Sequence, residues 1–146
     1  MIPNIRFLSI RFRAIAQATE VEERVLKAIE FASGSKNVAV THTTGHFGTS
    51  ILIMEVEILK NREIRQFIER LDTAGILSQI AGQADARTDE DCVFHIRLDK
   101  QKAFQEELEL AADKDVIDVR LKVGVYPASR EGAVRVISEW LDALIS

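Results

Sequence analysis

The stretch Phe-His-Ile-Arg-Leu-Asp-Lys-Gln-Lys-Ala-Phe, residues 94–104, changes its hydrophobic period in the middle. Apolar and polar residues alternate through 94–98, which is typical of a strand with one buried face. Asp99 is a favourable N-cap, and apolar residues then recur at roughly helical spacing over 103–110. Alternation returns in 117–123. The segment therefore predicts a strand, a helix and a second strand.

The chain before this segment predicts one further strand, a helix and a pair of strands. Residues 5–15 alternate and place Leu8, Ile10, Phe12 and Ala14 on one face. Thr19 and Glu22 have the spacing of a capping box, and Gly34 is expected to end the helix that follows. Two more strands are expected at 36–43 and 50–59, joined by a loop in which Gly45 and Gly48 bracket His46 and Phe47. We expect this loop to be mobile and to expose both residues.

Asn61 is expected to cap a helix that runs to Ile80 with a break at Gly75, and Pro127 and Ser129 are expected to begin a last helix. The whole order is strand, helix, strand, strand, helix, strand, helix, strand, helix. It predicts an α+β fold with a mostly antiparallel five-stranded sheet and helices packed on one face.

Length and composition indicate one domain covering residues 1–146. The chain is 47% hydrophobic and 29% charged, which excludes a disordered protein. No apolar run approaches the about 20 residues that span a bilayer, so we expect a cytoplasmic protein with no membrane partner. The net charge is −4 and does not by itself indicate a nucleic-acid partner. The single Cys92 is expected to be a small core residue.

Metal-binding and catalytic motifs are weak. His42 and His46 are four residues apart and Cys92 and His95 three apart, but positions three apart on a strand point to opposite faces. No nucleophile elbow and no phosphate-binding Gly-rich loop followed by a helix and lysine occur. We therefore expect no metal, no cofactor and no catalytic activity.

Cations cluster at the predicted helix start. Lys100 and Lys102 occupy the first turn, where the helix dipole disfavours positive charge, and Arg97 lies just upstream. These groups could bind a phosphate at the helix N-terminus. Alternatively, Asp99 caps the helix and the lysines reach solvent or pair with Glu106.

The face of the sheet opposite the helices is expected to present a basic strand face with Arg11 and Arg13. Arg97 lies among the other charged residues of that face, which are His95, Arg120, Lys122, Glu55, Glu57 and Asp118. Such a face could follow an RNA backbone, form a dimer interface through its charges, or simply be solvated.

Several motifs together resemble a known archaeal family. They are Ala-Gln-Ala-Thr-Glu at 16–20, Thr-Gly-His-Phe-Gly-Thr-Ser-Ile at 44–51, Ile-Arg-Leu-Asp-Lys-Gln-Lys-Ala at 96–103 and Asp-Val-Ile-Asp-Val-Arg at 115–120. The chain is similar over nearly its whole length to a family of predicted RNA-binding proteins, or exosome subunits with a double-stranded-RNA-binding-like fold. The first two family motifs more often carry a histidine at position 17 and an asparagine at position 49.

The resemblance implies RNA as the partner, and exosome or ribosome-related proteins as further partners. Together with the charge pattern, it favours six residues as contacts to RNA phosphates, namely Arg11, Arg13, His46, Arg97, Lys100 and Lys102. The alternative hypothesis is a homodimer or larger homo-oligomer whose sheet face is a subunit interface and which binds no RNA.

Overall fold

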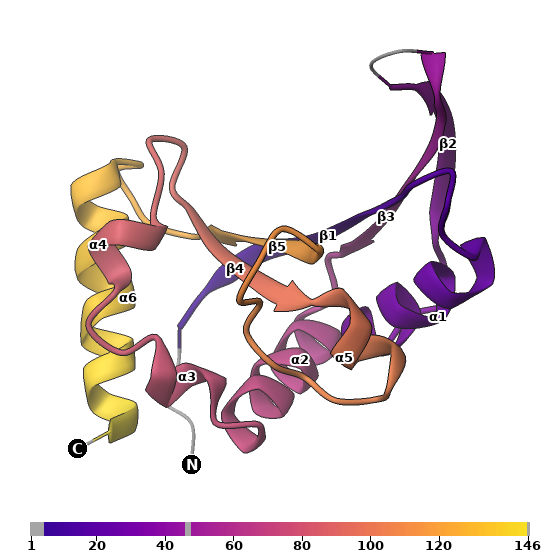
Figure 1. Cartoon of the computed structure of the whole chain (residues 1–146). Coiled ribbons are helices and arrows are strands. Elements are labelled where there is room, and N and C mark those ends of the chain that lie inside the picture. Colours follow the sequence, from indigo (N-terminus) through magenta and orange to yellow (C-terminus); the bar gives the residue numbers. More distant parts are fainter. Residues whose placement is uncertain (1–4, 46–47, 146) are drawn as a thin grey trace. The chain divides into compact units, whose positions relative to one another are not determined.

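The computed structural model describes residues 5–45 and 48–145, and Figure 1 shows the arrangement of its elements. Its five strands form one antiparallel sheet in the order β2-β3-β1-β5-β4, so the predicted α+β fold is confirmed. His46 and Phe47 lie outside the described residues. The elements are β1 (Phe7–Ala16), α1 (Glu22–Ser33), β2 (Ala39–Thr44), β3 (Ser50–Ile58), α2 (Asn61–Thr73), α3 (Ile76–Gln79), α4 (Ala84–Arg87), β4 (Val93–Asp99), α5 (Lys100–Phe104), β5 (Val116–Val123) and α6 (Arg130–Ile145).

The chain divides into two compact units, and each consists of segments that are far apart in sequence. Unit 1 consists of Met1–Ile10, Ile58–Ile96 and Arg120–Ser146, and unit 2 of Arg11–Glu57 and Arg97–Val119. Whether 1–146 acts as a single domain stays a prediction. Among the described residues, no helix is both long and apolar enough to cross a membrane.

In unit 2, α1 buries an apolar stripe that includes Val25, Ala28 and Ile29. The helix ends at Gly34, whose φ of 73° is the left-handed conformation expected of a glycine C-cap. The predicted capping box is wrong, because α1 begins at Glu22 and its N-cap position is held by Val21, with no side-chain cap. α1 and α5 pack together and lie on the same side of the strands of this unit (Figure 1).

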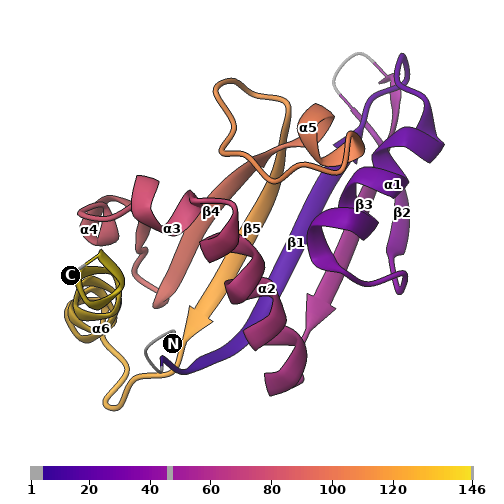
Figure 2. The ribbon, with the colours of Figure 1, turned by 90° about the horizontal axis from the view of Figure 1, so that it is seen from below.

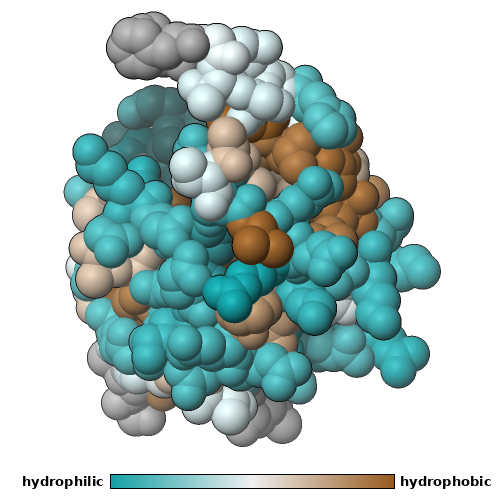
Figure 3. Space-filling view, turned by 45° about the vertical axis from the view of Figure 1, so that its right-hand side comes forward, coloured by the Kyte–Doolittle hydropathy of each residue, from teal (hydrophilic) through white to brown (hydrophobic). Residues whose placement is uncertain are grey.

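The hairpin formed by β2 and β3 extends from the rest of unit 2 (Figures 1 and 2). The two strands pair from Ala39 opposite Glu55 to Thr44 opposite Ser50. Every residue of β2 is exposed, so this strand covers no core with either face. Figure 3 shows brown apolar atoms gathered below the pale atoms near the top of the hairpin. Val40 is exposed although it pairs with the buried Met54, and Leu52 and Ile53, which precede Met54 on β3, are half-buried.

In unit 1, α6 packs against α3 and α4. The ring of Trp140 on α6 meets the ring of Phe7 edge-on, with centroids 5.6 Å apart. The expected break at Gly75 is confirmed, since Gly75 has a φ of 80° and separates α2 from α3. The predicted cap at Asn61 is wrong by one residue, because Lys60 holds the N-cap position. The short helix α4 was not predicted.

β1 departs from regular alternation near its start. Phe7 and Ile10 are both buried although they are three residues apart, and Leu8 is 44% exposed. The prediction that Leu8 faces the core is therefore wrong. From Ile10 onward the expected alternation holds, with Phe12 and Ala14 buried.

Cys92 lies in unit 1 just before β4 and is buried, as predicted. Its φ of 62° is unusual for a residue other than glycine. The backbone holds this conformation through two hydrogen bonds: the N–H of Cys92 donates to the carbonyl of Asp89 at 3.2 Å, and the N–H of Val123 donates to the carbonyl of Cys92 at 2.9 Å.

Candidate nucleic-acid interface

The strands of unit 2 present two arginines on the face opposite the core. Arg11 and Arg13 alternate on β1 with the buried Phe12 and Ala14, so both point away from the helices. Arg11 is exposed, and its Nε donates to Oε2 of Glu57 on β3 at 2.7 Å. One hydrogen-bonding edge of this guanidinium is therefore already engaged, while the side chain as a whole stays 70% exposed.

Arg13 is different, because its charge is not balanced locally. The side chain is half-buried, and its Nε is fully covered without a hydrogen-bond partner. In the part of the chain that the structure describes, no carboxylate lies within ion-pair distance of Arg13. Leaving a buried donor unpaired costs about 1–3 kcal/mol and more for a charged group. The covered Nε is out of reach of a ligand, but the accessible part of the side chain carries a positive charge that an external anion would balance.

Arg97 lies on β4, two strands from β1 in the sheet. It is exposed and is followed by the buried Leu98, so it points to the same side as Arg11 and Arg13. Its guanidinium makes no ion pair or hydrogen bond to any residue of 5–45 or 48–145. Two strand spacings separate β4 from β1 laterally, which is about 10 Å.

Lys100 does not occupy the predicted position. We expected an ammonium group projecting from a helix start to a phosphate, but the residue is only 4% exposed. Its Nζ donates to the carbonyl oxygen of Ile15 at 2.9 Å and lies 2.8 Å from Oε2 of Glu20 and 2.7 Å from Oδ1 of Asp115. These three acceptors come from distant segments and saturate the ammonium. The prediction of Lys100 as an exposed contact is wrong for this reason.

Lys100 influences the ionisation of Asp115. Partial burial alone would raise the pKa of Asp115, but hydrogen bonds from Lys100 and Gln101 and the nearby positive charge together lower this pKa below its ordinary value. The carboxylate is therefore stabilised in its ionised form next to the ammonium.

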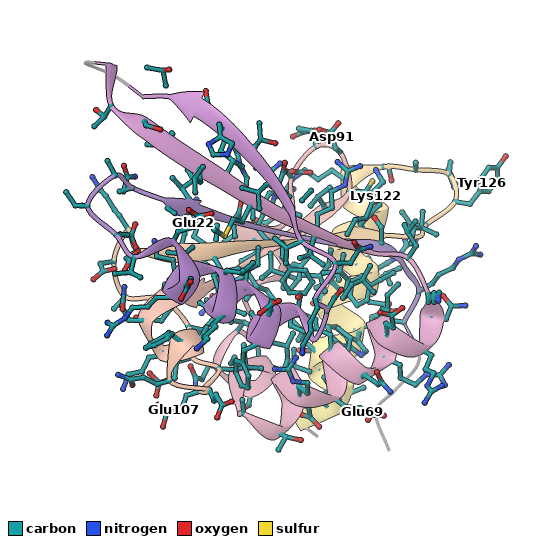
Figure 4. The ribbon with its side chains drawn as sticks, turned by 90° about the vertical axis from the view of Figure 1, so that its right-hand side faces the viewer. Glu22, Glu69, Asp91, Glu107, Lys122 and Tyr126 are labelled. Carbon is teal, nitrogen blue, oxygen red and sulfur yellow. The ribbon has the colours of Figure 1, made fainter. Side chains whose placement is uncertain are left out.

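Lys102 is a weakly engaged cation on the helix side. Its side chain is 43% exposed, and its Nζ lies 3.7 Å from Oε2 of Glu107, whose side chain points outward in Figure 4. The predicted cap is confirmed, because Asp99 Oδ1 accepts from the backbone N–H of Lys102 at 2.9 Å. The helix is shorter than predicted, since α5 ends at Phe104 and Leu110 forms a bridge with Leu98. Arg97, Lys100 and Lys102 consequently do not form one phosphate site.

Sequence patterns did not reveal a cleft between α1 and α5. The cleft has a volume of about 220 Å³. The guanidinium carbon of Arg24 lies 5.0 Å from the centroid of the Phe104 ring at its wall. One sequence signal was available, since Val21 interrupts a polar stretch and is 58% exposed at the rim. The lining residues are Thr19, Glu20, Val21, Arg24, Val25, Lys100, Gln101 and Phe104.

The ionisable groups of unit 1 that the sequence singled out are engaged internally. His95 Nε2 lies 2.7 Å from Oδ2 of Asp89. Partial burial would raise the pKa of Asp89, but hydrogen bonds from His95 and from the backbone N–H groups of Val93 and Asp91 lower it. The ammonium of Lys122 donates to the backbone carbonyl of Asp91, and Figure 4 shows the two residues side by side. No cluster of His, Cys, Asp and Glu suited to a metal occurs within 5–45 and 48–145.

Comparison with known proteins shows relatives along the whole chain. RNA-binding protein PAB1135 of Pyrococcus abyssi is 37% identical, and the match covers 97% of this chain and 98% of that protein. The crystal structure of protein AF2318 from Archaeglobus fulgidus is 33% identical with a TM-score of 0.82, covering 92% of this chain and 99% of the other. The structure of Mth689, a DUF54 protein from Methanothermobacter thermautotrophicus, is 28% identical with a TM-score of 0.77, and the match covers 92% of this chain and 98% of that chain.

A family model described as RNA binding matches residues 9–123. This span includes β1 with Arg11 and Arg13, the cleft between α1 and α5, and both strands that flank α5. The chain therefore belongs to this RNA-binding family.

Proposed function

We propose that the protein binds RNA without catalysing its breakdown, and that it holds RNA phosphates against the outer strand face of unit 2. Arg11, Arg13 and Arg97 make the contacts on that face. A guanidinium suits this role because it presents several donors in a planar arrangement that matches phosphate oxygens.

The unbalanced state of Arg13 is the observation that carries the proposal. Its buried Nε has no partner among the described residues, whereas Arg11 beside it on the same strand is paired with Glu57. A phosphate bound at the accessible part of the Arg13 side chain would balance a charge that no described carboxylate balances. Membership of the RNA-binding family supports RNA as the source of that phosphate.

The other three residues predicted from the sequence as RNA contacts differ in how well the structure supports that role. Lys102 lies on the helix side and not on the strand face; it remains a proposed contact to a phosphate of RNA that reaches that side, because its ammonium is partly exposed and only weakly paired. His46 remains a prediction outside the described residues. Lys100 is not proposed as a direct phosphate contact, since its ammonium is saturated by protein acceptors. Attachment to the exosome or another RNA-processing assembly is also part of the proposal, and rests on the resemblance of the sequence motifs.

A salt titration of RNA binding tests this proposal. About four phosphate contacts predict a slope near −3 for log affinity against log salt on single-stranded RNA. Arg13→Met should weaken binding by about tenfold and reduce the steepness of the slope by about 0.7, because one charge-assisted contact is lost. Lys27→Met removes the same charge from the exposed side of α1 and is the matched control.

Stability measured in parallel makes the test specific. Arg13→Met removes a buried donor without a partner, so the free energy of unfolding should hold or rise while RNA affinity falls. If Arg13→Met and Lys27→Met bind RNA as the parent does, the strand face is not the binding surface. If the parent protein itself binds no RNA at low salt, the proposed function fails.

A second candidate function is self-association, and the β2 strand favours it. β2 is at the edge of the sheet and contains no Lys, Arg, Asp, Glu or Pro, the residues that usually protect an exposed edge from pairing. A second copy could add its own β2 there. Sedimentation equilibrium of the parent and of Thr41→Pro distinguishes the two: a dimer lost in Thr41→Pro, together with absent RNA binding, would favour this alternative.

A further inference from the structure

The cleft between α1 and α5 combines an apolar wall with a polar rim. Phe104, Val21 and Val25 form its apolar part, and Gln101 and Thr19 bring uncharged hydrogen-bonding groups to it. Phe104 is half-buried, so part of its ring borders open space, and Val21 at the rim is 58% exposed. An aromatic ring with polar groups around it is suited to a flat ligand that has a π-face and hydrogen-bonding edges.

The charges of the cleft favour an uncharged ring over a phosphate. Of its two cations, Lys100 is paired with the carboxylates of Glu20 and Asp115, which both lie within 3.0 Å of its ammonium, whereas Arg24 lies over the Phe104 ring. Together these two cations and two carboxylates carry no net charge. This local balance leaves little net attraction for an anion. On the strand face Arg11 is paired with Glu57, but no described carboxylate lies within ion-pair distance of Arg13 or Arg97, so the two surfaces differ in electrostatic character.

The size and the stacking geometry are also suited to a single base. A volume of about 220 Å³ is below the roughly 300–1,000 Å³ typical of pockets for drug-sized ligands. The guanidinium carbon of Arg24 lies over the Phe104 ring, 5.0 Å from the ring centroid, so one planar group already stacks on this ring. Single-stranded RNA is commonly recognised by stacking unpaired bases on aromatic rings and arginine planes.

We propose that this cleft takes one unstacked nucleobase of a bound single-stranded RNA, with Phe104 as the stacking surface and Gln101 as a hydrogen-bonding group at the base edge. This inference rests on the proposed RNA-binding function and adds to it the kind of RNA, because a base in a duplex cannot enter the cleft. Lys100 then has a positioning role: it fixes Glu20 and Asp115, and Asp115 in turn accepts a hydrogen bond from Gln101 at 2.9 Å.

Fluorescence of 2-aminopurine provides the test. The probe is a single-stranded 12-residue oligouridine in which every third base is replaced by 2-aminopurine, and stacking on Phe104 should quench its emission. Phe104→Leu keeps an apolar side chain against α1 but removes the ring. We expect this substitution to abolish the quenching. We also expect it to weaken RNA binding by about 5- to 20-fold, which lies in the lower part of the range for loss of one base–aromatic stack.

Two further variants control for general effects of the substitution. Phe104→Tyr retains the ring and should quench as the parent does. Phe31→Leu makes the same change at a half-buried phenylalanine of α1 outside the cleft and should leave both quenching and affinity unchanged. Gln101→Ala alters an exposed residue and should reduce affinity with the fold intact, which keeps the test valid even if Phe104→Leu is unstable.

The possible outcomes separate this inference from the proposed function. If the parent binds the probe but Phe104→Leu and Gln101→Ala bind and quench equally well, the cleft is not a base site although RNA binding stands. Equal affinity for a blunt duplex of the same length would also overturn the inference. If the parent binds neither the single-stranded probe nor the duplex, the proposed function has failed, and the cleft inference fails with it.

Discussion

The ammonium nitrogen of Lys100 lies 2.9 Å from the carbonyl oxygen of Ile15, a residue 85 positions earlier in the chain. This contact joins the first residue of α5 to the end of β1. The same nitrogen reaches Glu20 in the connection to α1 and Asp115 in the connection to β5. Lys100 therefore connects three segments of unit 2, namely α5, the stretch from the end of β1 to α1, and the connection to β5.

Lys100→Met should destabilise the protein. Removing one partner of a fully buried ion pair costs about 3–5 kcal/mol, and because the carboxylates here are partly exposed we expect about 2 kcal/mol. Urea unfolding measures this loss. Lys102→Met, which removes a weakly paired and more exposed ammonium, should change the free energy of unfolding by less than about 0.5 kcal/mol. Equal changes in the free energy of unfolding for the two variants would contradict the connecting role of Lys100.

Stability should depend on the ionisation of Asp115 in acid. Its pKa is lowered in the folded protein, so the ionised carboxylate stabilises the fold at pH values above the ordinary value of about 3.9. That contribution is lost as the pH falls through the lower folded pKa. Asp115→Asn should be less stable than the parent at pH 7, and the difference should narrow at pH 3. Thermal melts at both pH values measure it; a constant difference would argue against the pairing.

The ion pair between Arg11 and Glu57 should contribute little to stability despite its distance of 2.7 Å. Both side chains are substantially exposed, and pairs of this kind are worth about 0.2–1 kcal/mol. A double-mutant cycle with Arg11→Met and Glu57→Gln gives the coupling energy. A value above about 2 kcal/mol would show that the pair is more shielded from solvent than its exposure indicates.

Gly34→Ala should lower stability by about 1 kcal/mol, because an alanine is strained at the left-handed φ of 73° that ends α1. The exposed Lys36 lies just beyond the helix end, and Lys36→Ala should be close to neutral. Thermal unfolding of the two variants gives the comparison. A neutral Gly34→Ala would mean that the end of α1 relaxes without loss of packing.

Local periodicity was enough to predict the strands, the main helices and the α+β class. The alternation through β4 and β5 and the apolar stripe of α1 depend on neighbours within a few residues, so the sequence contains their signal directly. The helix start near Thr19 was misplaced because Glu20, inside the expected capping box, instead accepts hydrogen bonds from the backbone of Gln17 and from Lys100.

The candidate site was predictable only in part, because only some of its features depend on residues that are close in sequence. The outward orientation of Arg11 and Arg13 follows from alternation on β1. The pairing of Arg11 with Glu57 and the burial of Lys100 depend on strand order and on loops that meet in space. A single sequence does not contain that information, so an arginine with a partner and one without look alike in it.

Chemical labelling of the buried Cys92 thiol can report local unfolding of unit 1. A thiol reagent cannot reach this sulfur while the turn before β4 is closed, because the residue is 3% exposed. Since the sequence contains a single cysteine, any modification of the native protein reports separation of that turn from β5, where Val123 donates to the Cys92 carbonyl. The rate of labelling would then follow local unfolding of unit 1 without an engineered probe.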